Sequence, residues 1–288
     1  MKGRIFVSVP SFRDSECENT IFDLLSKADF PNLIDLGVCL QLNAQDDQCL
    51  IKSRHNQSIV YISDERATGP FYARFLTLEL FKGQEYVFFI DSHMRFEKGW
   101  DTFYKNEINS LPLKSVLSSY PGAYILPNII VPDTETKILK PDHFDSDDML
   151  RIVGVSTSID HPTPCNFWAS GLSFSRSDII SVLPFSSEFP FLFFGEELLV
   201  SVMLYTHGYI CFAPSKNVAY HLWQRNYRPQ LQIDLKLRKF SQERLKYLLV
   251  DYQNESKFWG NEKTIKQFEQ LTNLEFSSCS VVSIDTTL

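Results

Sequence analysis

Five consecutive apolar residues, Tyr86–Ile90, constrain the fold of this chain more than any other segment. A strand that is apolar on both faces belongs inside a sheet that helices cover on both sides. Residues 5–9 form a second short run rich in β-branched side chains, and the spacing of apolar residues in 16–27 predicts a helix after it. We therefore expect an α/β fold with a mainly parallel sheet, which binds its ligands at the carboxyl ends of the strands.

Strands and helices are expected to alternate along most of the chain. The apolar patterns predict strands at 36–42, 59–62, 116–119, 152–156, 167–174 and 209–213, and helices at 71–81 and 196–206. Residues 112–150 are rich in Pro, Asp and Ser around one predicted strand, which is typical of surface excursions and of a lid over the sheet.

The composition changes near residue 229, where helical patterns rich in Lys, Gln and Leu begin. The apolar positions that we expect these helices to bury are Leu231, Leu235, Phe240, Leu245 and Leu248. The sequence therefore predicts a main domain over 1–228 and a helical C-terminal appendage over 229–288.

The overall composition limits the partners of the chain. The formal net charge is −7 and no Lys/Arg cluster stands out, so nucleic acid is not an expected partner. A small anion such as a nucleotide can still be held by a metal ion, a helix N-terminus or one arginine. The six cysteines are scattered without a CxxC pair, which indicates reduced thiols in a cytoplasmic protein. No segment approaches the roughly 18 apolar residues of a spanning helix, so we expect no transmembrane segment.

Three polar residues follow the buried strand directly: Asp91, Ser92 and His93. They should emerge at the carboxyl edge of the sheet, where the ligand sites of open α/β folds lie. Alternate residues of an extended segment point the same way, so Asp91 and His93 can present a carboxylate oxygen and an imidazole nitrogen to one cation. Such a pair suits Mn²⁺ better than Ca²⁺. The alternative is an ordinary strand-end aspartate that caps a turn.

Two later segments carry further candidates for a catalytic site. Glu196 and Glu197 follow Gly195 in the first turn of a predicted helix, where a carboxylate either caps the helix or lines a pocket, binding acceptor hydroxyls or acting as a base. His221 follows the strand 209–213 between aromatic neighbours, and is either a core histidine or a third metal ligand. An Asp-His-His set would leave positions open for two phosphate oxygens.

The first strand is followed by Pro10-Ser11-Phe12-Arg13-Asp14, at the usual position of a loop that receives a nucleotide. Arg13 and Asp14 are candidates for contacts with the base or ribose, and a surface salt bridge is the alternative. Gly69-Pro70 begins the helix that carries Arg74, whose guanidinium can reach a phosphate or can simply be exposed.

Five motifs, in this order, resemble those of the GlcNAc-transferases that attach α-linked N-acetylglucosamine to proteins. They extend from residue 5 to residue 229 and comprise Ile5–Asp14, Gly69–Arg74, Ile90–Phe96, Phe193–Glu197, and Tyr220–Trp223 with Arg228-Pro229. The resemblance implies a GT-A fold, a UDP-sugar donor and a divalent metal ion held by Asp91 and His93. The more distant polypeptide GalNAc-transferases have a similar Asp-x-His with a later histidine in the metal site, a role that the resemblance implies for His221.

The same resemblance implies an activity. It is the transfer of GlcNAc from UDP-GlcNAc, with retention of configuration, to a hydroxyl group on a protein, at hydroxyproline, Ser or Thr. We assign the nucleotide sugar to residues from several segments: Pro10, Ser11, Arg13, Asp14, Arg74, Asp91, Ser92, Gly171 and Trp223. One position departs from the family, because Thr68 stands where an arginine is expected before Gly-Pro.

Other functions fit parts of this pattern. A transferase of another UDP-sugar, such as GalNAc or glucose, or one that acts on a glycan, would have the same fold. A noncatalytic nucleotide-binding module would share it too, although the presence of Asp91, His93, Glu196 and His221 favours an enzyme. A nucleotidyltransferase would need a glycine-rich, lysine-bearing phosphate loop, which residues 10–14 do not resemble.

Overall fold

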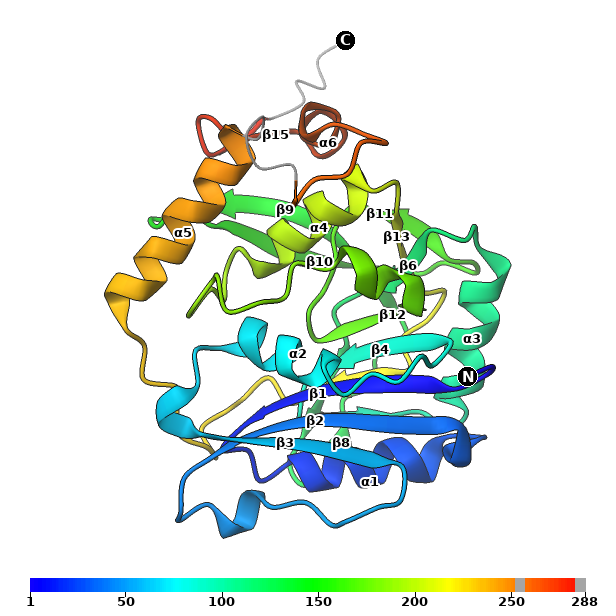
Figure 1. The fold of residues 1–288 in the computed structure, drawn as a ribbon. Coiled ribbons are helices and arrows are strands. Elements are labelled where there is room, and N and C mark those ends of the chain that lie inside the picture. Colours follow the sequence, from blue (N-terminus) through cyan, green and yellow to red (C-terminus); the bar gives the residue numbers. More distant parts are fainter. Residues whose placement is uncertain (252–256, 283–288) are drawn as a thin grey trace.

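A computed structural model describes residues 1–251 and 257–282, built around an eight-stranded sheet with the order β11-β13-β6-β12-β4-β1-β2-β3 (Figure 1). One half of the sheet consists of parallel strands: β1 (Ile5–Phe12), β2 (Ile34–Leu42), β3 (Gln57–Ser63) and β4 (Tyr86–Ile90). The other half is mixed: β12 (Leu172–Arg176) lies antiparallel between β4 and β6 (Ser115–Ser118), and β13 (Ile210–Ala213) runs parallel to β6. The edge strand β11 (Thr163–Cys165) pairs antiparallel with β13.

Helices cover both faces of this sheet, as Figure 1 shows. α1 (Cys17–Lys27) and α3 (Trp100–Ser110) share one apolar core with Val7 and Phe88 of the strands. α2 (Pro70–Leu78) and α4 (Glu196–Thr206) share a second core with the neighbouring residues Phe6 and Phe89. Because successive strand residues point to opposite faces, every residue of β4 is buried, as its apolar sequence predicts. The expected α/β fold class is therefore confirmed.

Smaller elements surround the carboxyl end of the sheet. A four-stranded sheet has the order β5 (Met94–Phe96), β14 (Ala219–His221), β7 (Gly122–Ile125) and β8 (Ile129–Ile130). β9 (Thr136–Phe144) and β10 (Leu150–Thr157) form an antiparallel hairpin. Short 3₁₀ helices occupy Pro31–Leu33, Asp47–Cys49, Asp64–Arg66 and Ser177–Val182.

The C-terminal segment contains α5 (Leu235–Val250), α6 (Ile265–Thr272) and the paired strands β15 (Leu274–Glu275) and β16 (Ser280–Val281). Leu245 and Leu248 are fully buried, as predicted, and belong to the same core as α4. Leu235 and Phe240 were expected to be buried, but their exposed fractions are 65% and 53%. The reason is that α5 buries a narrow stripe of Ser241, Leu245, Leu248 and Leu249, so its first turns contribute nothing to the core.

The predicted strand at 167–174 is wrong in its first half, because only its last three residues lie in β12. Phe167 and Trp168 are apolar because they are buried in the core, in a segment without ladder hydrogen bonds. Side chains satisfy the backbone there: Ser201 Oγ accepts from the Trp168 N–H at 2.8 Å, and Ser118 Oγ accepts from the Ala169 N–H at 2.6 Å. An apolar run can thus be a buried loop when hydroxyl groups replace strand partners.

The segment 112–150 is more regular than expected from its composition. In place of one strand it contains β6, β7, β8 and β9 and the start of β10. The burial of Leu139 on β9 explains why this polar stretch becomes a strand, since the side of the hairpin that carries Leu139 packs on the core.

Several surface and core properties bear on the sequence predictions. All six cysteines lie in the described part of the chain and are unpaired, and five of them are buried. Among the described helices, none is long and apolar enough to cross a membrane.

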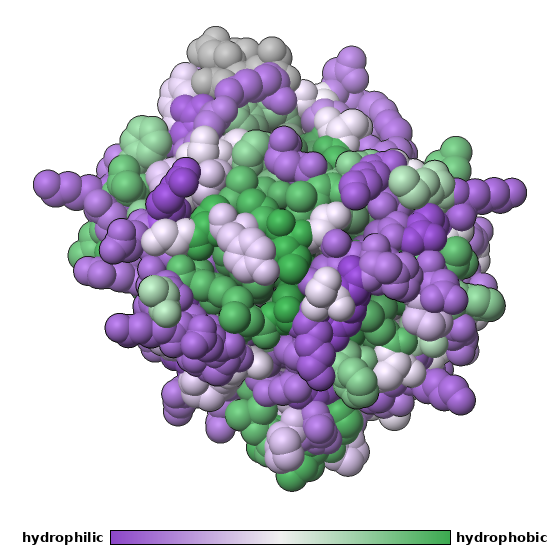
Figure 2. All heavy atoms as spheres, turned by 60° about the horizontal axis from the view of Figure 1, so that its bottom comes forward, coloured by the Kyte–Doolittle hydropathy of each residue, from purple (hydrophilic) through white to green (hydrophobic). Residues whose placement is uncertain are grey.

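Figure 2 shows a face on which apolar side chains gather near the centre and hydrophilic ones surround them, a distribution that often marks a ligand or partner surface.

Candidate active site

A cavity of about 1110 Å³ opens at the carboxyl ends of the parallel strands. The strands contribute Pro10 and Phe12 from β1 and Gln41 from β2, and Asp91 lies just after β4. Ligand sites of open α/β sheets lie at this edge, so its position is the one expected. The opposite wall is mostly aromatic and aliphatic: Tyr120, Leu150, Ile152, Phe191, Phe193, Phe194 and Trp223.

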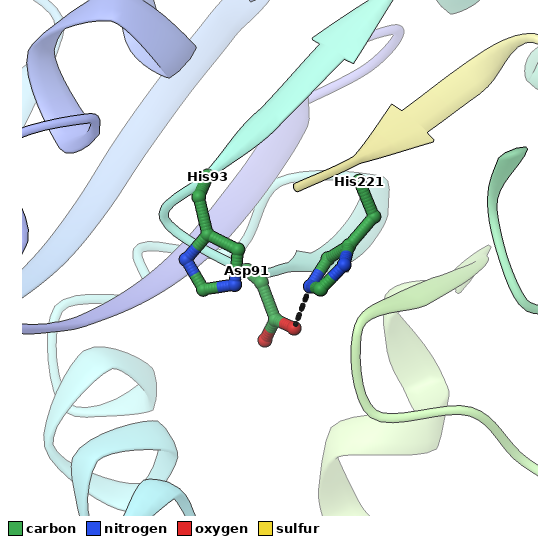
Figure 3. A group of neighbouring side chains, drawn as sticks. All are labelled: Asp91, His93 and His221. Atoms are coloured by element: carbon green, nitrogen blue, oxygen red, sulfur yellow. Dashed lines mark hydrogen bonds and ion pairs between the residues drawn. The ribbon is translucent and has the colours of Figure 1, made fainter. Parts of the chain in front are cut away.

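Asp91, His93 and His221 meet in this cavity, with one potential ligand atom from each within 4.8 Å of the others (Figure 3). Strand pairing accounts for the meeting, because His221 of β14 stands opposite Met94 of β5, the residue after His93. The His221 Nε2 lies 3.1 Å from Asp91 Oδ2, and the ring centroids of the two histidines are 4.5 Å apart. Residues far apart in sequence are thus brought to one point.

The protonation states of these groups fit a cation site. Burial lowers the pKa of His221 to about 4, so its imidazole is neutral at pH 7. Burial alone would raise the pKa of Asp91, but the hydrogen bond from His221 and the charge of Arg74 hold it well below its usual range. One carboxylate and two imidazoles form a ligand set that suits Mn²⁺ and related divalent ions.

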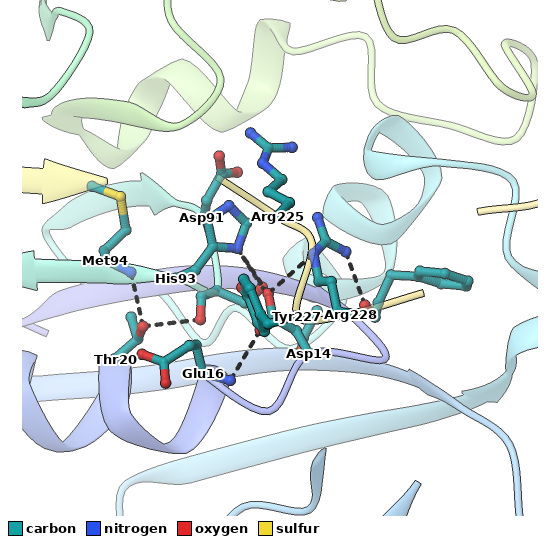
Figure 4. A network of polar contacts seen from close by, with 12 residues as sticks. Asp14, Glu16, Thr20, Asp91, His93, Met94, Arg225, Tyr227 and Arg228 are labelled. Atoms are coloured by element: carbon teal, nitrogen blue, oxygen red, sulfur yellow. Dashed lines mark hydrogen bonds and ion pairs between the residues drawn. The ribbon is translucent and has the colours of Figure 1, made fainter. Parts of the chain in front are cut away.

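His93 is held from behind by a network around Asp14 (Figure 4). Its Nδ1 lies 2.7 Å from Asp14 Oδ2, while its Nε2 is buried and has no hydrogen-bond partner among the described residues. Ser92, Tyr227 and the backbone of Glu16 also donate to the Asp14 carboxylate. Burial would raise the pKa of Asp14, but the hydrogen bond with His93 and the charge of Arg228 lower it.

A second buried network lies on the α2 and α4 side of the cavity. Arg74, only 1% exposed, donates to Glu196 Oε1 at 2.8 Å, to Asp91 Oδ1 at 3.3 Å and to the Ser170 carbonyl at 2.9 Å. Burial raises the pKa of Glu196 to about 7, although the Arg74 charge opposes this rise. Arg74 therefore links the aspartate of the cation cluster to the first turn of α4.

Glu197 faces the cavity from the next position of α4. Its carboxylate accepts hydrogen bonds from the Tyr120 hydroxyl at 2.6 Å and from the Ser170 N–H at 2.8 Å. Burial raises its pKa despite these hydrogen bonds. Of the two adjacent glutamates, Glu197 borders the cavity and Glu196 lies behind it.

The structure divides the remaining candidates by their access to the cavity. Nine of the sequence candidates border it: Pro10, Arg74, Asp91, Ser92, His93, Gly171, Glu197, His221 and Trp223. Ser11 and Asp14 are fully buried behind it. Arg13 adopts a positive φ of 46° and turns to Asp46 and Asp64, so its guanidinium forms ion pairs away from the cavity.

Sequence reasoning missed several cavity residues, among them Gln41, Tyr120 and Arg225. Arg225 Nη2 lies 3.4 Å from His221 Nε2, and Arg228 donates to the Phe12 carbonyl at 3.0 Å. Two arginines soon after His221 were a usable signal for an anion-binding segment. No local pattern distinguishes Gln41 or Tyr120 from ordinary surface residues.

Comparison with known proteins identifies the family. The model of the family described as Glycosyltransferase (GlcNAc) matches residues 4–63 and 53–281 of this chain. The chain belongs to this glycosyltransferase family. A search of curated proteins gives no match.

Solved structures of two glycosyltransferases share the fold of this one. The crystal structure of GalNAc-T7 with UDP, GalNAc and Mn²⁺ matches 96% of the chain with a TM-score of 0.64 at 12% identity. The chain spans 55% of the length of that protein. The structure of residues 1–349 of S. aureus TarS in complex with UDP-GlcNAc matches 96% of the chain, with a TM-score of 0.55 at 14% identity, and the match covers 72% of that TarS fragment. The likeness confirms the expected GT-A glycosyltransferase fold.

Proposed function

We propose that this glycosyltransferase uses a divalent metal ion, with Mn²⁺ as the preferred ion, to transfer GlcNAc from UDP-GlcNAc to a hydroxyl group of a protein. One observation carries the proposal: Asp91, His93 and His221 converge in a cavity at the carboxyl edge of the sheet. A diphosphate leaving group concentrates negative charge, which a divalent cation stabilises as a Lewis acid.

The residues of the cluster fit a metal ion on their own chemistry. The buried Nε2 of His93 lacks a hydrogen-bond partner within residues 1–251 and 257–282, and a buried nitrogen of this kind is costly unless something binds it. His221 and Asp91 offer a neutral imidazole and a carboxylate at the same point. We propose these three residues as the metal ligands, with Arg74 and Arg225 beside them as partners for phosphate oxygens.

The donor is proposed from two kinds of support. The family description names GlcNAc, and the similar TarS structure contains UDP-GlcNAc. GalNAc-T7, the other similar structure, contains UDP and GalNAc, so UDP-GalNAc is the alternative donor. We propose that Pro10, Ser92, Gly171 and Trp223, which border the cavity, contact the nucleotide sugar.

The acceptor side of the cavity is proposed to lie near Glu197 and the aromatic wall. Glu197 is the carboxylate of α4 that borders the cavity, and we propose that it binds or deprotonates the acceptor hydroxyl. Glu196 acts on Arg74 and is a positioning residue. The protein acceptor, the retaining stereochemistry and a division into 1–228 and 229–288 stay proposals drawn from the sequence.

The test is a donor panel with purified protein. UDP release from UDP-GlcNAc, UDP-GalNAc and UDP-glucose is measured with Mn²⁺, with excess EDTA and after Mn²⁺ is added back. We expect turnover with UDP-GlcNAc, its loss in EDTA and its recovery with Mn²⁺. Undiminished turnover in EDTA would refute the metal site, and turnover with another donor alone would refute the GlcNAc assignment.

A further inference from the structure

Asp14 has a full set of hydrogen-bond donors and no contact with the cavity. It lies beyond β1, is 0% exposed, and does not line the cavity despite its position in the loop after the first strand. The backbone N–H of Glu16 and the Tyr227 hydroxyl each donate to its Oδ1 at 2.9 Å. Ser92 Oγ donates to its Oδ2 at 2.8 Å. A carboxylate so enclosed cannot contact a nucleotide directly.

Asp14 also contacts the ring of His93, at 2.7 Å from Oδ2 to Nδ1 (Figure 4), and Arg228 Nε lies 3.7 Å from the same Oδ2. An ionised carboxylate only accepts hydrogen bonds, so Nδ1 must carry the proton of the imidazole. In a neutral imidazole the other nitrogen then holds the lone pair. That nitrogen, Nε2, is buried and has no hydrogen-bond partner in the part of the chain that the structure describes, and His93 belongs to the cluster with Asp91.

We propose that Asp14 is a positioning residue of the metal site, which fixes the tautomer and the ring orientation of His93 so that Nε2 faces the metal ion. The inference rests on the proposed metal-dependent function and extends it to a residue that touches neither metal nor substrate. Carboxylate partners of this kind raise the basicity of metal-binding histidines, and their loss typically weakens metal binding by about 10–100-fold.

The donors around Asp14 determine what Asp14→Asn would do. The backbone N–H of Glu16 cannot reverse its direction, so the carbonyl oxygen of an asparagine should occupy the Oδ1 position. The amide NH₂ then occupies the Oδ2 position and points at Nδ1 of His93. Nδ1 must become an acceptor, the proton moves to Nε2, and the lone pair for the metal is lost. Asp14→Asn, which barely changes the size of the side chain, should thus reverse the tautomer of His93.

Asp101→Asn is the matched control for the stability that is lost when a buried, hydrogen-bonded aspartate is replaced by asparagine. Asp101 is also 0% exposed and accepts two backbone hydrogen bonds, from Asp29 at 2.8 Å and Phe30 at 3.0 Å, away from the cavity. Mn²⁺ affinity and apo thermal stability are measured for the wild type, Asp14→Asn, Asp101→Asn and His93→Ala. We expect Asp14→Asn to weaken Mn²⁺ binding by about 10–100-fold and Asp101→Asn to leave it unchanged.

A second measurement uses the wild-type protein and does not depend on the variant folding. The ¹⁵N resonances of His93, assigned by their absence in His93→Ala, should report a protonated Nδ1 and an unprotonated Nε2 in the apo protein. The opposite tautomer would overturn the proposal.

The outcomes separate this inference from the function on which it rests. If His93→Ala loses Mn²⁺ binding and Asp14→Asn keeps it, Asp14 has no positioning role and the metal site stands. If neither variant changes Mn²⁺ affinity, both the metal site and the inference are overturned.

Discussion

Because Gly171 has no side chain, there is space beside it for the carboxylate of Asp91, one of the three proposed metal ligands. A Cβ at this position would lie 2.9 Å from Asp91 Oδ2, whereas ordinary contact begins at about 3.4 Å. The φ of Gly171 is not positive, so alanine fits the backbone and only the contact with Asp91 is disturbed. Gly171→Ala should therefore push the carboxylate by about 0.5 Å, the difference between these two distances.

The expected loss follows from that displacement. A misplacement of 1 Å in a reacting site costs about 100-fold in rate, so roughly half of it should cost about 10-fold. Unfolding free energy should change by no more than about 1 kcal/mol, because alanine also restricts the unfolded chain. UDP release, Mn²⁺ affinity and Tm are measured together, with Ser173→Ala as a control in the adjoining strand. Wild-type turnover in Gly171→Ala would refute the close fit at Asp91, and a large loss of Tm would assign the defect to folding.

Three further variants test other parts of the site. His221→Ala should weaken Mn²⁺ binding while apo Tm changes little, because its partners Asp91 and Arg225 both border the cavity and can be hydrated; a destabilised variant with unchanged Mn²⁺ affinity would make His221 a core residue. Glu197→Gln should lower kcat by about 100-fold or more if this carboxylate acts as a base, and an unchanged kcat in steady-state assays would exclude that role. The pKa of Glu196 rises from its usual 4.5 to about 7 on folding, so the folded state binds more protons than the unfolded state between these pH values. The wild type should therefore lose stability relative to Glu196→Gln as the pH rises from about 4.5 to about 7. Melting curves of both proteins over this pH range measure the change, and a difference in Tm that stays constant with pH would contradict the prediction.

The local sequence was sufficient to predict the elements in which the apolar pattern matches the observed burial. Tyr86–Ile90 is apolar because both of its faces are covered, and it was predicted with its observed bounds. The same reasoning failed at 167–171, where apolar residues fill the core from a loop whose backbone is satisfied by Ser118 and Ser201. Those hydroxyls come from other elements, and no local pattern indicates them.

The site was predictable where its polar residues come directly after a strand. Asp91 and His93 come after a strand that ends at the ligand edge, so their position followed from the fold. The role of Asp14 was not predictable, because the same loop could have presented it to a nucleotide or buried it. Its burial depends on Tyr227, more than 200 residues later in the sequence.

The antiparallel strand β12 lies between β4 and β6, although it follows both of them in the chain. During synthesis β6 emerges at residues 115–118, but both of its partners, β12 and β13, arrive only with residues 172–176 and 210–213. The first four strands can meanwhile pair with one another, since β1 contacts β2 and β4 directly. Until β12 is made, one edge of β4 stays open, and an open edge of apolar strands invites pairing with other chains. We therefore expect a stage of synthesis at which β1 to β4 can pair while one edge of β4 is still open to other chains.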